Sequence, residues 1–246
     1  MNDLQGKKAL VTGGSRGIGA AIALALAERG ADVAITYERS AEKAAAVVAA
    51  IEGKGRRGLG IQANGESPEA VERSVAEAVK VLGGLDILVN NAAIARGGPF
   101  SELTLEDLQA LLDVNVRAPV LAAKAAIPHL KKGGRIINIG SGLGERVPMA
   151  GVTAYSMTKS ALLSFTKGLA RELGPLGVTV NLVQPGSTDT EMNPASGPQA
   201  DFQRGLTALG RYGKAEEVAS VVAFVASPAA DLVTGAVINV DGGASA

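Results

Sequence analysis

Short apolar runs alternate with longer amphipathic stretches along nearly the whole chain, and this alternation limits the fold more than any other feature. The apolar runs are residues 8–12, 32–36, 59–63, 85–90, 135–139, 178–183 and 236–240. Helical patterns occupy residues 18–29, 41–52, 68–82, 105–130, 152–173 and 215–226. Because nearly continuous apolar runs indicate strands buried on both faces, we expect an α/β fold in which a parallel sheet of seven strands has helices on both faces.

No linker, internal repeat or low-complexity tract divides the 246 residues. The sequence therefore predicts a single doubly wound, Rossmann-type domain over residues 1–246. Ligands of such sheets bind at the carboxyl ends of the strands, where the strand order reverses. Residues 186–211 are rich in Gly, Pro and Ser, and their length predicts a mobile lid over a substrate site.

Composition excludes several kinds of protein. Lys plus Arg and Asp plus Glu both number 24, so no net charge favours nucleic acid or an anionic membrane, and neither partner is expected. The chain has no cysteine, and no cluster of His and carboxylates has metal-binding spacing, so no metal is expected. The start lacks a signal-like apolar stretch and no run approaches about 18 apolar residues, which predicts a cytoplasmic protein.

Tyr155 and Lys159 stand four residues apart within a helical pattern, so their side chains should share one face of a helix. An ammonium beside a phenol favours the phenolate, and such a pair can exchange protons with a substrate oxygen near neutral pH. By itself the spacing is more often that of a solvated lysine over a half-buried tyrosine.

A glycine-rich turn, residues 12–19, connects the first predicted strand to the first helix. Its glycines permit positive φ and close approach of a diphosphate, and the helix start offers free N–H groups. A tight connection without a ligand is the alternative. The segment Asn90-Asn91-Ala92-Ala93 ends the fourth strand: its small residues would let a flat ring lie close, and its carboxamides could hold adjacent strands or a loop. A strand ended by turn-forming Asn is the alternative there.

Together these segments resemble the short-chain dehydrogenase/reductase family over essentially the whole chain. The matching elements, in order, are residues 12–19, residues 90–93, Asn115, Ser141, Tyr155, Lys159 and Pro185-Gly186. Within the family the chain is similar to 3-oxoacyl-[acyl-carrier-protein] reductases and to NADPH-dependent carbonyl reductases. The resemblance implies a seven-stranded Rossmann-type sheet, a nicotinamide cofactor and a homotetramer.

The resemblance also implies a catalytic set. Tyr155 would donate a proton, Lys159 would lower the Tyr155 pKa and hold the nicotinamide ribose, and Ser141 would hydrogen-bond the substrate oxygen. Pro119 has no N–H for the Asn115 carbonyl, so we expect the long helix to kink there. In relatives a water near this Asn links the Lys to solvent; a kinked helix without a proton relay is the alternative.

The cofactor-binding residues that the resemblance implies are Gly13, Ser15, Arg16, Gly17, Ile18, Gly19, Tyr37, Arg39, Asn64, Asn91, Ala92, Tyr155, Lys159, Pro185, Gly186, Thr188 and Thr190. Asn64 replaces an Asp that meets the adenine amino group in many members, and its oxygen could still accept that hydrogen bond. Tyr37 takes the place of the acid that binds the ribose 2′-hydroxyl in NAD-preferring members, and Arg16 and Arg39 could bind a 2′-phosphate. NADPH is therefore expected over NADH, although Glu38 could repel the phosphate.

The expected function is an NADPH-dependent carbonyl reductase acting on a small ketone or 3-oxo ester. The alternatives are a 3-oxoacyl-[acyl-carrier-protein] reductase and a non-catalytic NADP-binding regulator. Acyl carrier protein is acidic, yet Leu176 replaces an Arg that such reductases often have, and the lid carries Asp189 and Glu191. Lys131 and Lys132 could supply some positive charge near the pocket mouth.

Overall fold

All seven strands pair in parallel in one sheet, in the computed structural model that describes residues 3–246. The strand order is β3-β2-β1-β4-β5-β6-β7. The strands are β1 (Lys8–Val11), β2 (Asp32–Tyr37), β3 (Gly58–Gln62), β4 (Ile87–Asn90), β5 (Arg135–Ile139), β6 (Thr179–Pro185) and β7 (Val237–Val240). The predicted doubly wound sheet is confirmed, and the order reverses between β1 and β4, so their carboxyl ends should border a ligand.

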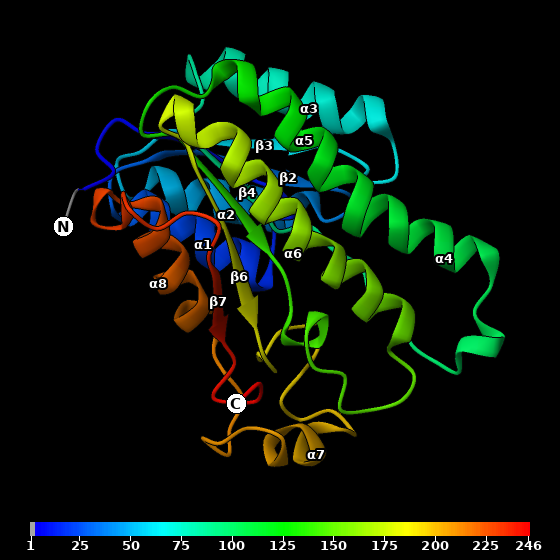
Figure 1. Cartoon of the computed structure of the whole chain (residues 1–246). Helices are drawn as coiled ribbons and strands as arrows, with labels where there is room; N and C mark the ends of the chain where they lie inside the picture. Colours follow the sequence, from blue (N-terminus) through cyan, green and yellow to red (C-terminus); the bar gives the residue numbers. More distant parts are fainter. Residues whose placement is uncertain (1–2) are drawn as a thin grey trace.

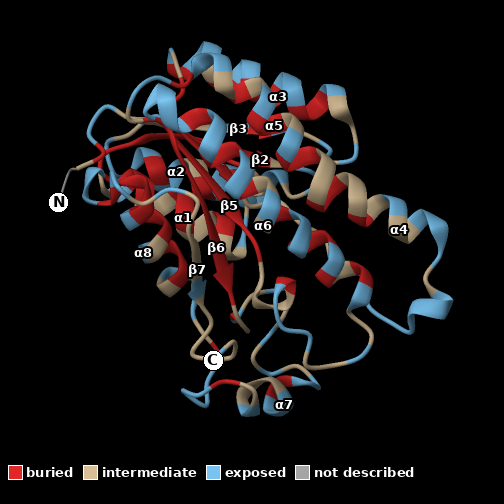
Figure 2. Cartoon of the chain, viewed as in Figure 1, coloured by how far each residue is buried: buried red, intermediate tan, exposed pale blue. Residues whose placement is uncertain are grey.

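Helices cover both faces of the sheet (Figure 1). One apolar cluster joins the sheet to α1 (Gly17–Glu28), α2 (Ala41–Glu52) and α8 (Ala215–Ala226). A second cluster joins it to α3 (Pro68–Leu82), α5 (Ala118–Ala126) and α6 (Thr153–Leu173). The strands are the most deeply buried part of the chain, while the outer faces of the helices are exposed (Figure 2). Burial on both faces of the inner strands explains their largely apolar sequences, whereas the edge strands β3 and β7 are only partly buried.

Shorter elements lie mostly in the connections. They are α4 (Leu105–Leu112), α7 (Ala200–Gly205) and the 3₁₀ turns η1 (Phe100–Glu102), η3 (Ile127–His129), η4 (Gly142–Gly144), η5 (Gly174–Leu176) and η6 (Pro228–Ala230). The predicted lid segment contains α7, which lies beyond the carboxyl ends of the strands (Figure 1). No helix within residues 3–246 is both long and apolar enough to cross a membrane.

The single long helix predicted over residues 105–130 is interrupted. It consists of α4, a π-helical turn η2 (Asp113–Arg117), α5 and finally η3. Pro119 lacks the N–H that a regular helix would use at this point, and its ring crowds the preceding turn. A wider turn relieves both problems, so the expected kink takes the form of a π bulge that contains Asn115.

An ion-pair cluster ties β2 to the start of β3 at the end of the sheet away from the carboxyl ends. Asp32 Oδ1 accepts hydrogen bonds from Arg56 Nη2 at 2.8 Å and from the Arg57 backbone N–H at 3.0 Å, and Oδ2 accepts from Arg57 Nε at 3.1 Å. Burial raises the pKa of the Asp32 carboxyl, but the bonds from Arg57 and Arg56 outweigh it, so the pKa is lowered overall.

Replacing Asp32 with Ala should destabilise the protein without changing its chemistry. The change removes the buried carboxylate that accepts hydrogen bonds from both arginines. Since Arg57 is half-exposed and water screens its charge, we expect only a moderate loss of about 2 kcal/mol in the free energy of unfolding. Urea denaturation measures the loss. Asp201→Ala is the control, since Asp201 pairs with Arg204 while fully exposed, and its loss should be much smaller. Equal losses in the two variants would contradict the role of the cluster.

Candidate active site

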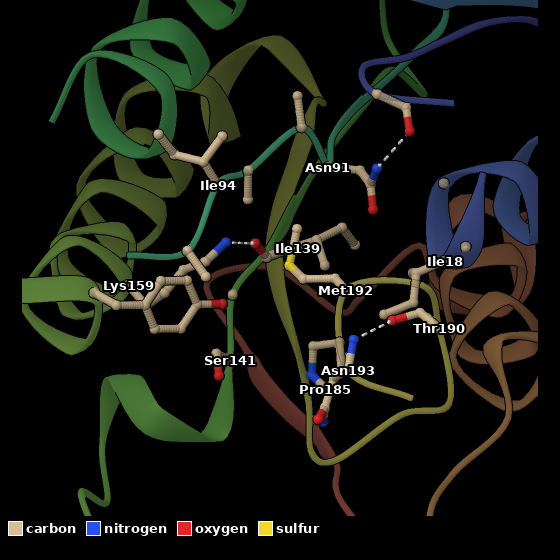
Figure 3. Close-up of a pocket in the computed structure, with 18 of the residues that line it drawn as sticks. Ile18, Asn91, Ile94, Ile139, Ser141, Lys159, Pro185, Thr190, Met192 and Asn193 are labelled. Carbon is tan, nitrogen blue, oxygen red and sulfur yellow. Dashed lines mark hydrogen bonds between the residues drawn. The ribbon is translucent and has the colours of Figure 1, made fainter. Parts of the chain in front are cut away.

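A cavity of about 790 Å³ runs along the carboxyl ends of the strands. Its walls come from the glycine-rich turn, the ends of β2, β4, β5 and β6, the start of α6 and the lid segment (Figure 3). Of the predicted site residues, those that line the cavity are Gly13, Ser15, Arg16, Gly17, Ile18, Gly19, Tyr37, Arg39, Asn91, Ala92, Ser141, Tyr155, Lys159, Pro185, Gly186, Thr188 and Thr190. Only Asn64 and Asn115 lie outside the lining.

The glycine-rich turn fits tightly against the end of β4. A Cβ atom at Gly13 would lie 2.9 Å from the Ala92 Cα, and one at Gly19 would lie 2.4 Å from Asn91 Nδ2. Gly13 and Gly17 also have positive φ values of 65° and 52°. Glycine is therefore required by both conformation and space. Arg16, the N-cap of α1, makes no capping bond with its side chain, so the first amide groups of the helix can face a ligand.

Asn91 and Thr12 join the ends of β1 and β4. Thr12 Oγ1 accepts hydrogen bonds from the backbone N–H groups of Asn91 at 2.9 Å and Ala92 at 3.0 Å. Asn91 Nδ2 donates to the carbonyl of Thr12 at 2.9 Å and to that of Gly13 at 3.2 Å. The Asn91 carboxamide thus holds the glycine-rich turn in place, as expected if the carboxamides of this segment hold adjacent strands or a loop.

A buried chain of polar side chains supports the floor of the site. Asn90 Nδ2 donates to Asn138 Oδ1 at 2.9 Å, and Asn138 Nδ2 donates to Thr166 Oγ1 at 2.8 Å. The chain crosses from β4 to β5 and then to α6, the helix that carries Tyr155 and Lys159. Because buried polar groups need defined partners, this chain fixes the position of α6 relative to the strand ends.

The structure brings Ser141, Tyr155 and Lys159 together at one end of the cavity. Ser141 follows β5 and caps η4, with Oγ accepting the Leu143 N–H at 3.2 Å. Lys159 lies one helical turn after Tyr155, and its Nζ is 5.8 Å from the centroid of the Tyr155 ring. Nζ donates to the Ile139 carbonyl at 3.0 Å (Figure 3). The ammonium is thereby held at the end of β5, facing the cavity.

The protonation of this group differs in one respect from the sequence-based expectation. Burial raises the pKa of the Tyr155 phenol, and hydrogen bonding by Ser141 opposes the rise. Burial lowers the pKa of Lys159 from 10.5 to about 8. The expected lowering of the Tyr155 pKa by Lys159 is not supported, because the ammonium is directed at the Ile139 carbonyl and not at the phenol oxygen.

Asn115 acts from behind the cavity. Its Oδ1 accepts the Ile94 N–H at 2.9 Å, and its Nδ2 donates to the Ile94 carbonyl at 2.9 Å and to Thr158 Oγ1 at 3.1 Å. Thr158 Oγ1 in turn donates to the Tyr155 carbonyl at 2.7 Å. The side chain therefore ties the loop after β4 to the first turn of α6. The proton relay near Asn115 stays a prediction.

The part of the cavity predicted to hold the adenosine lies beside the end of β2. Tyr37 lines it where an acid would favour NAD, and Arg39 extends into solvent with Nε 3.0 Å from Glu38 Oε1. Asn64 does not reach the cavity, since its Oδ1 accepts the N–H of Glu66 at 2.9 Å. The expected adenine contact of Asn64 is therefore not supported; its neighbours Ala63 and Gly65 line the cavity instead.

The lid segment closes the side of the cavity that faces the glycine-rich turn. Thr190 and Asn193 form a tight turn, with the Asn193 N–H 3.1 Å from the Thr190 carbonyl (Figure 3). Gln203 of α7 exchanges hydrogen bonds of 2.8 and 3.1 Å with the Asn193 carboxamide. The segment thus has its own structure. Its apolar wall, with Met192 reaching toward the middle of the cavity, was not identified from the sequence because single apolar loop residues carry no pattern.

Other predicted charges lie elsewhere. Lys131, Lys132 and Leu176 are exposed near the amino ends of β5 and β6, opposite to the cavity, so the two lysines do not border its mouth. Arg96 and Arg146 line the cavity and were missed. The sequence showed that lysines precede β5 but not that the cavity opens at the other end of that strand. The single histidine, His129, is exposed in η3, away from the cavity lining.

Comparisons with known proteins agree with this geometry. The family model described as enoyl-(acyl carrier protein) reductase matches residues 13–245. A short-chain dehydrogenase of Burkholderia cenocepacia J2315, solved in complex with NADP, is 58% identical, with a TM-score of 0.98 and coverage of 99% of this chain and 100% of that chain.

Two curated proteins of different function are also similar over almost their whole length. The cyclic-di-GMP-binding biofilm dispersal mediator protein of Escherichia coli (strain K12) is 43% identical over 98% of both chains. A 3-oxoacyl-[acyl-carrier-protein] reductase of Synechocystis is 41% identical over 99% of this chain and 98% of that protein.

The doubly wound sheet, with a glycine-lined cavity at its switch point and a Ser–Tyr–Lys group beside it, defines a Rossmann-type oxidoreductase. Within that class, the match over residues 13–245 and the similarity over whole chains settle the family. The chain belongs to the short-chain dehydrogenase/reductase family.

Replacing Lys159 with Met should change the pH dependence of stability. Below pH 8 the ammonium is protonated in both states, so the cost of burying it is fully present. Between pH 8 and 10.5 the unfolded chain binds more protons at this group, so the stability of the unchanged protein rises with pH. From pH 7.5 to 10, the stability of Lys159→Met relative to the unchanged protein should fall by roughly 2 kcal/mol.

Denaturation by urea at several pH values measures this difference. Lys167→Met is the matched control, because Lys167 is exposed on the same helix and its variant should follow the unchanged protein. A constant gap between Lys159→Met and the unchanged protein across the pH range would show that burial does not lower the Lys159 pKa.

Proposed function

We propose that this chain is an NADPH-dependent carbonyl reductase that acts on a small ketone or 3-oxo ester, with Tyr155 as the proton donor. The observation that carries the proposal is the joining of two sites in one cavity. The glycine-rich turn lies at one end and Ser141, Tyr155 and Lys159 at the other. The active site and its substrate lid, residues 186–211, belong to the same domain, residues 1–246.

The residues present fit a nicotinamide dinucleotide. The positions of Gly13 and Gly19 leave no room for a Cβ, as expected where backbone must approach a diphosphate and a helix packs close to a strand. The last residue of β2 is Tyr37 and not an acid, and Arg16, which lines the cavity, would bind a 2′-phosphate. The Burkholderia relative was solved with NADP, which supports NADPH over NADH. Pro185, Gly186, Thr188 and Thr190 would border the nicotinamide half.

The chemistry follows from the residues at the catalytic end. The nicotinamide, when bound, supplies the hydride for the carbonyl carbon. Ser141 Oγ would hydrogen-bond the carbonyl oxygen and so stabilise the negative charge that develops there. The raised pKa keeps the Tyr155 phenol protonated near neutral pH, ready to donate to that oxygen. Lys159, whose Nζ lies 5.8 Å from the centroid of the Tyr155 ring, would hold the nicotinamide ribose next to the phenol.

Loss of NADPH absorbance with a panel of ketones and 3-oxo esters tests the proposal. Tyr155→Phe removes the proton donor while keeping the ring, so kcat should fall by about 10²- to 10⁴-fold with NADPH binding retained.

Asn115→Leu removes the residue predicted to hold the water of the proton relay, so it should lower kcat far more than it changes KM. NADH should give a lower kcat/KM than NADPH. An active Tyr155→Phe enzyme would contradict the assignment of the donor.

Reduction of carrier-bound 3-oxoacyl substrates is the second candidate, and the Synechocystis relative supports it. Arg146, which lines the cavity and hydrogen-bonds the Ala244 carbonyl, is a basic group that could meet an acidic partner. Against it stand the net charge of zero, which gives no long-range steering, and the exposed Asp189 of the lid. The apolar wall of Ile94, Met149 and Val152 fits a small ketone or ester equally well.

The two substrate classes differ in their response to salt. We expect kcat/KM for a simple 3-oxo ester to equal or exceed that for acetoacetyl carrier protein, with little change between low and high salt. A carrier substrate held by basic residues would lose efficiency as salt screens the charges. A strong and salt-sensitive preference for the carrier form would reverse the assignment.

A binding regulator without turnover is the remaining candidate, and one observation favours it: the Escherichia coli relative is named for binding cyclic-di-GMP. Binding of NADPH without oxidation of it by any ketone in the panel would support this role. A homotetramer stays a prediction from the family resemblance. Exposed apolar side chains on α4, α5 and α6, namely Leu105, Val120 and Met157, fit such an assembly.

A further inference from the structure

A carboxylate of the lid lies between two cations from different helices. Glu191 Oε2 is 3.0 Å from Arg16 Nη1, and Glu191 Oε1 is 2.6 Å from Lys43 Nζ. Arg16 caps α1, Lys43 lies in the first turn of α2, and all three side chains are about half-exposed. Both bonds lower the pKa of the Glu191 carboxyl, so it is ionised at neutral pH. The pairs connect the lid to the two helices nearest the adenosine end.

These charges lie where a cofactor with a 2′-phosphate differs from one without it. Arg16 and Glu191 line the cavity together with residues 37–40, which end β2 and lead into α2. The adenosine ribose of a dinucleotide lies at this strand end in Rossmann-type sheets. The lid packs against the adjacent glycine-rich turn, because a Cβ at Gly17 would lie 3.3 Å from Thr190 Cγ2, and Glu191 follows Thr190 directly. A ribose 2′-phosphate would therefore approach the two cations that Glu191 now neutralises.

We propose that Lys43 and Glu191 together set the preference for the 2′-phosphate: Lys43 is a second cation for it beside Arg16, and Glu191 competes with it for both cations. This inference rests on the proposed NADPH-dependent function. A phosphate monoester carries more negative charge than a carboxylate and offers three acceptor oxygens, so it can displace Glu191 from the exposed pairs. NADH has no such group and leaves the Glu191 pairs intact.

The exchange also links the cofactor to the lid. Glu191 directly follows Thr190, whose side chain packs over the glycine-rich turn, so release of the carboxylate frees the lid from α1 and α2 at this point. The sequence suggested that Glu38 could repel the phosphate. Within residues 3–246, however, Glu38 forms an ion pair with Arg39 and none with Lys43 or Arg16. Of Glu38 and Glu191, only Glu191 forms ion pairs with Arg16 and Lys43.

The test compares the Kd values of NADPH and NADH, measured by the fluorescence of the reduced cofactor, for the unchanged protein, Lys43→Gln, Glu191→Gln and the double variant. Lys43→Gln should weaken NADPH about fivefold, the upper range for an exposed pair, and change NADH less than twofold. Glu191→Gln should tighten NADPH about threefold and change NADH less than twofold. In the double variant the gain from Glu191→Gln should shrink, because one of the two contested cations is gone.

Glu72→Gln is the control and should leave both Kd values unchanged, because Glu72 is an exposed acid on α3 that neither lines the cavity nor pairs with Arg16, Lys43 or Glu191. Retained NADH binding shows that each variant is folded. An unchanged protein that binds neither cofactor would overturn the proposed function and this inference with it. An unchanged protein that binds NADPH, combined with a Glu191→Gln variant that weakens NADPH or shifts both cofactors equally, would overturn the inference alone. High salt should reduce the effects of both single variants on NADPH.

Discussion

The rest of the site depends on the close contact between the ends of β1 and β4. Four hydrogen bonds from Asn91 and Ala92 to Thr12 and Gly13 hold the glycine-rich turn against β4, and the glycines leave no gap between them. This contact lies where the strand order reverses, so the neighbouring connections diverge and leave the cavity open. Without it the first amide groups of α1 would not face the cavity.

At the catalytic end of the cavity, the Lys159 ammonium is buried beside the Tyr155 phenol. Burial lowers the pKa of Lys159 and raises that of Tyr155, so both groups favour their neutral forms. The Ile139 carbonyl compensates part of the cost for Lys159, and Asn115 with Thr158 fixes the helical turn that carries both residues. Precise placement and perturbed protonation therefore come from the same packing.

Much of the fold and of the site could be predicted from the sequence. The inner strands could be recognised because both of their faces are buried, and the glycine turn because few other residues tolerate its conformation. The division of the long helix was only partly predictable: Pro119 indicates a kink, but its relief by a π turn depends on what packs around Asn115. The absence of Asn64 from the cavity depends on a local turn with Glu66 that the strand pattern does not specify.

The sequence by itself determined the order of the elements, the family and the residue types available for proton transfer, because these follow from local periodicity and short motifs. Only the tertiary structure decided which charges meet. Glu191 counted as a repulsive lid acid in the sequence, yet it pairs with Arg16 and Lys43, which are 175 and 148 residues away. Lys131 and Lys132 counted as basic groups at the pocket mouth, yet they lie at the opposite end of the sheet. Charge interactions depend on distance in space, which the position in the chain does not fix until the helices and the lid have packed.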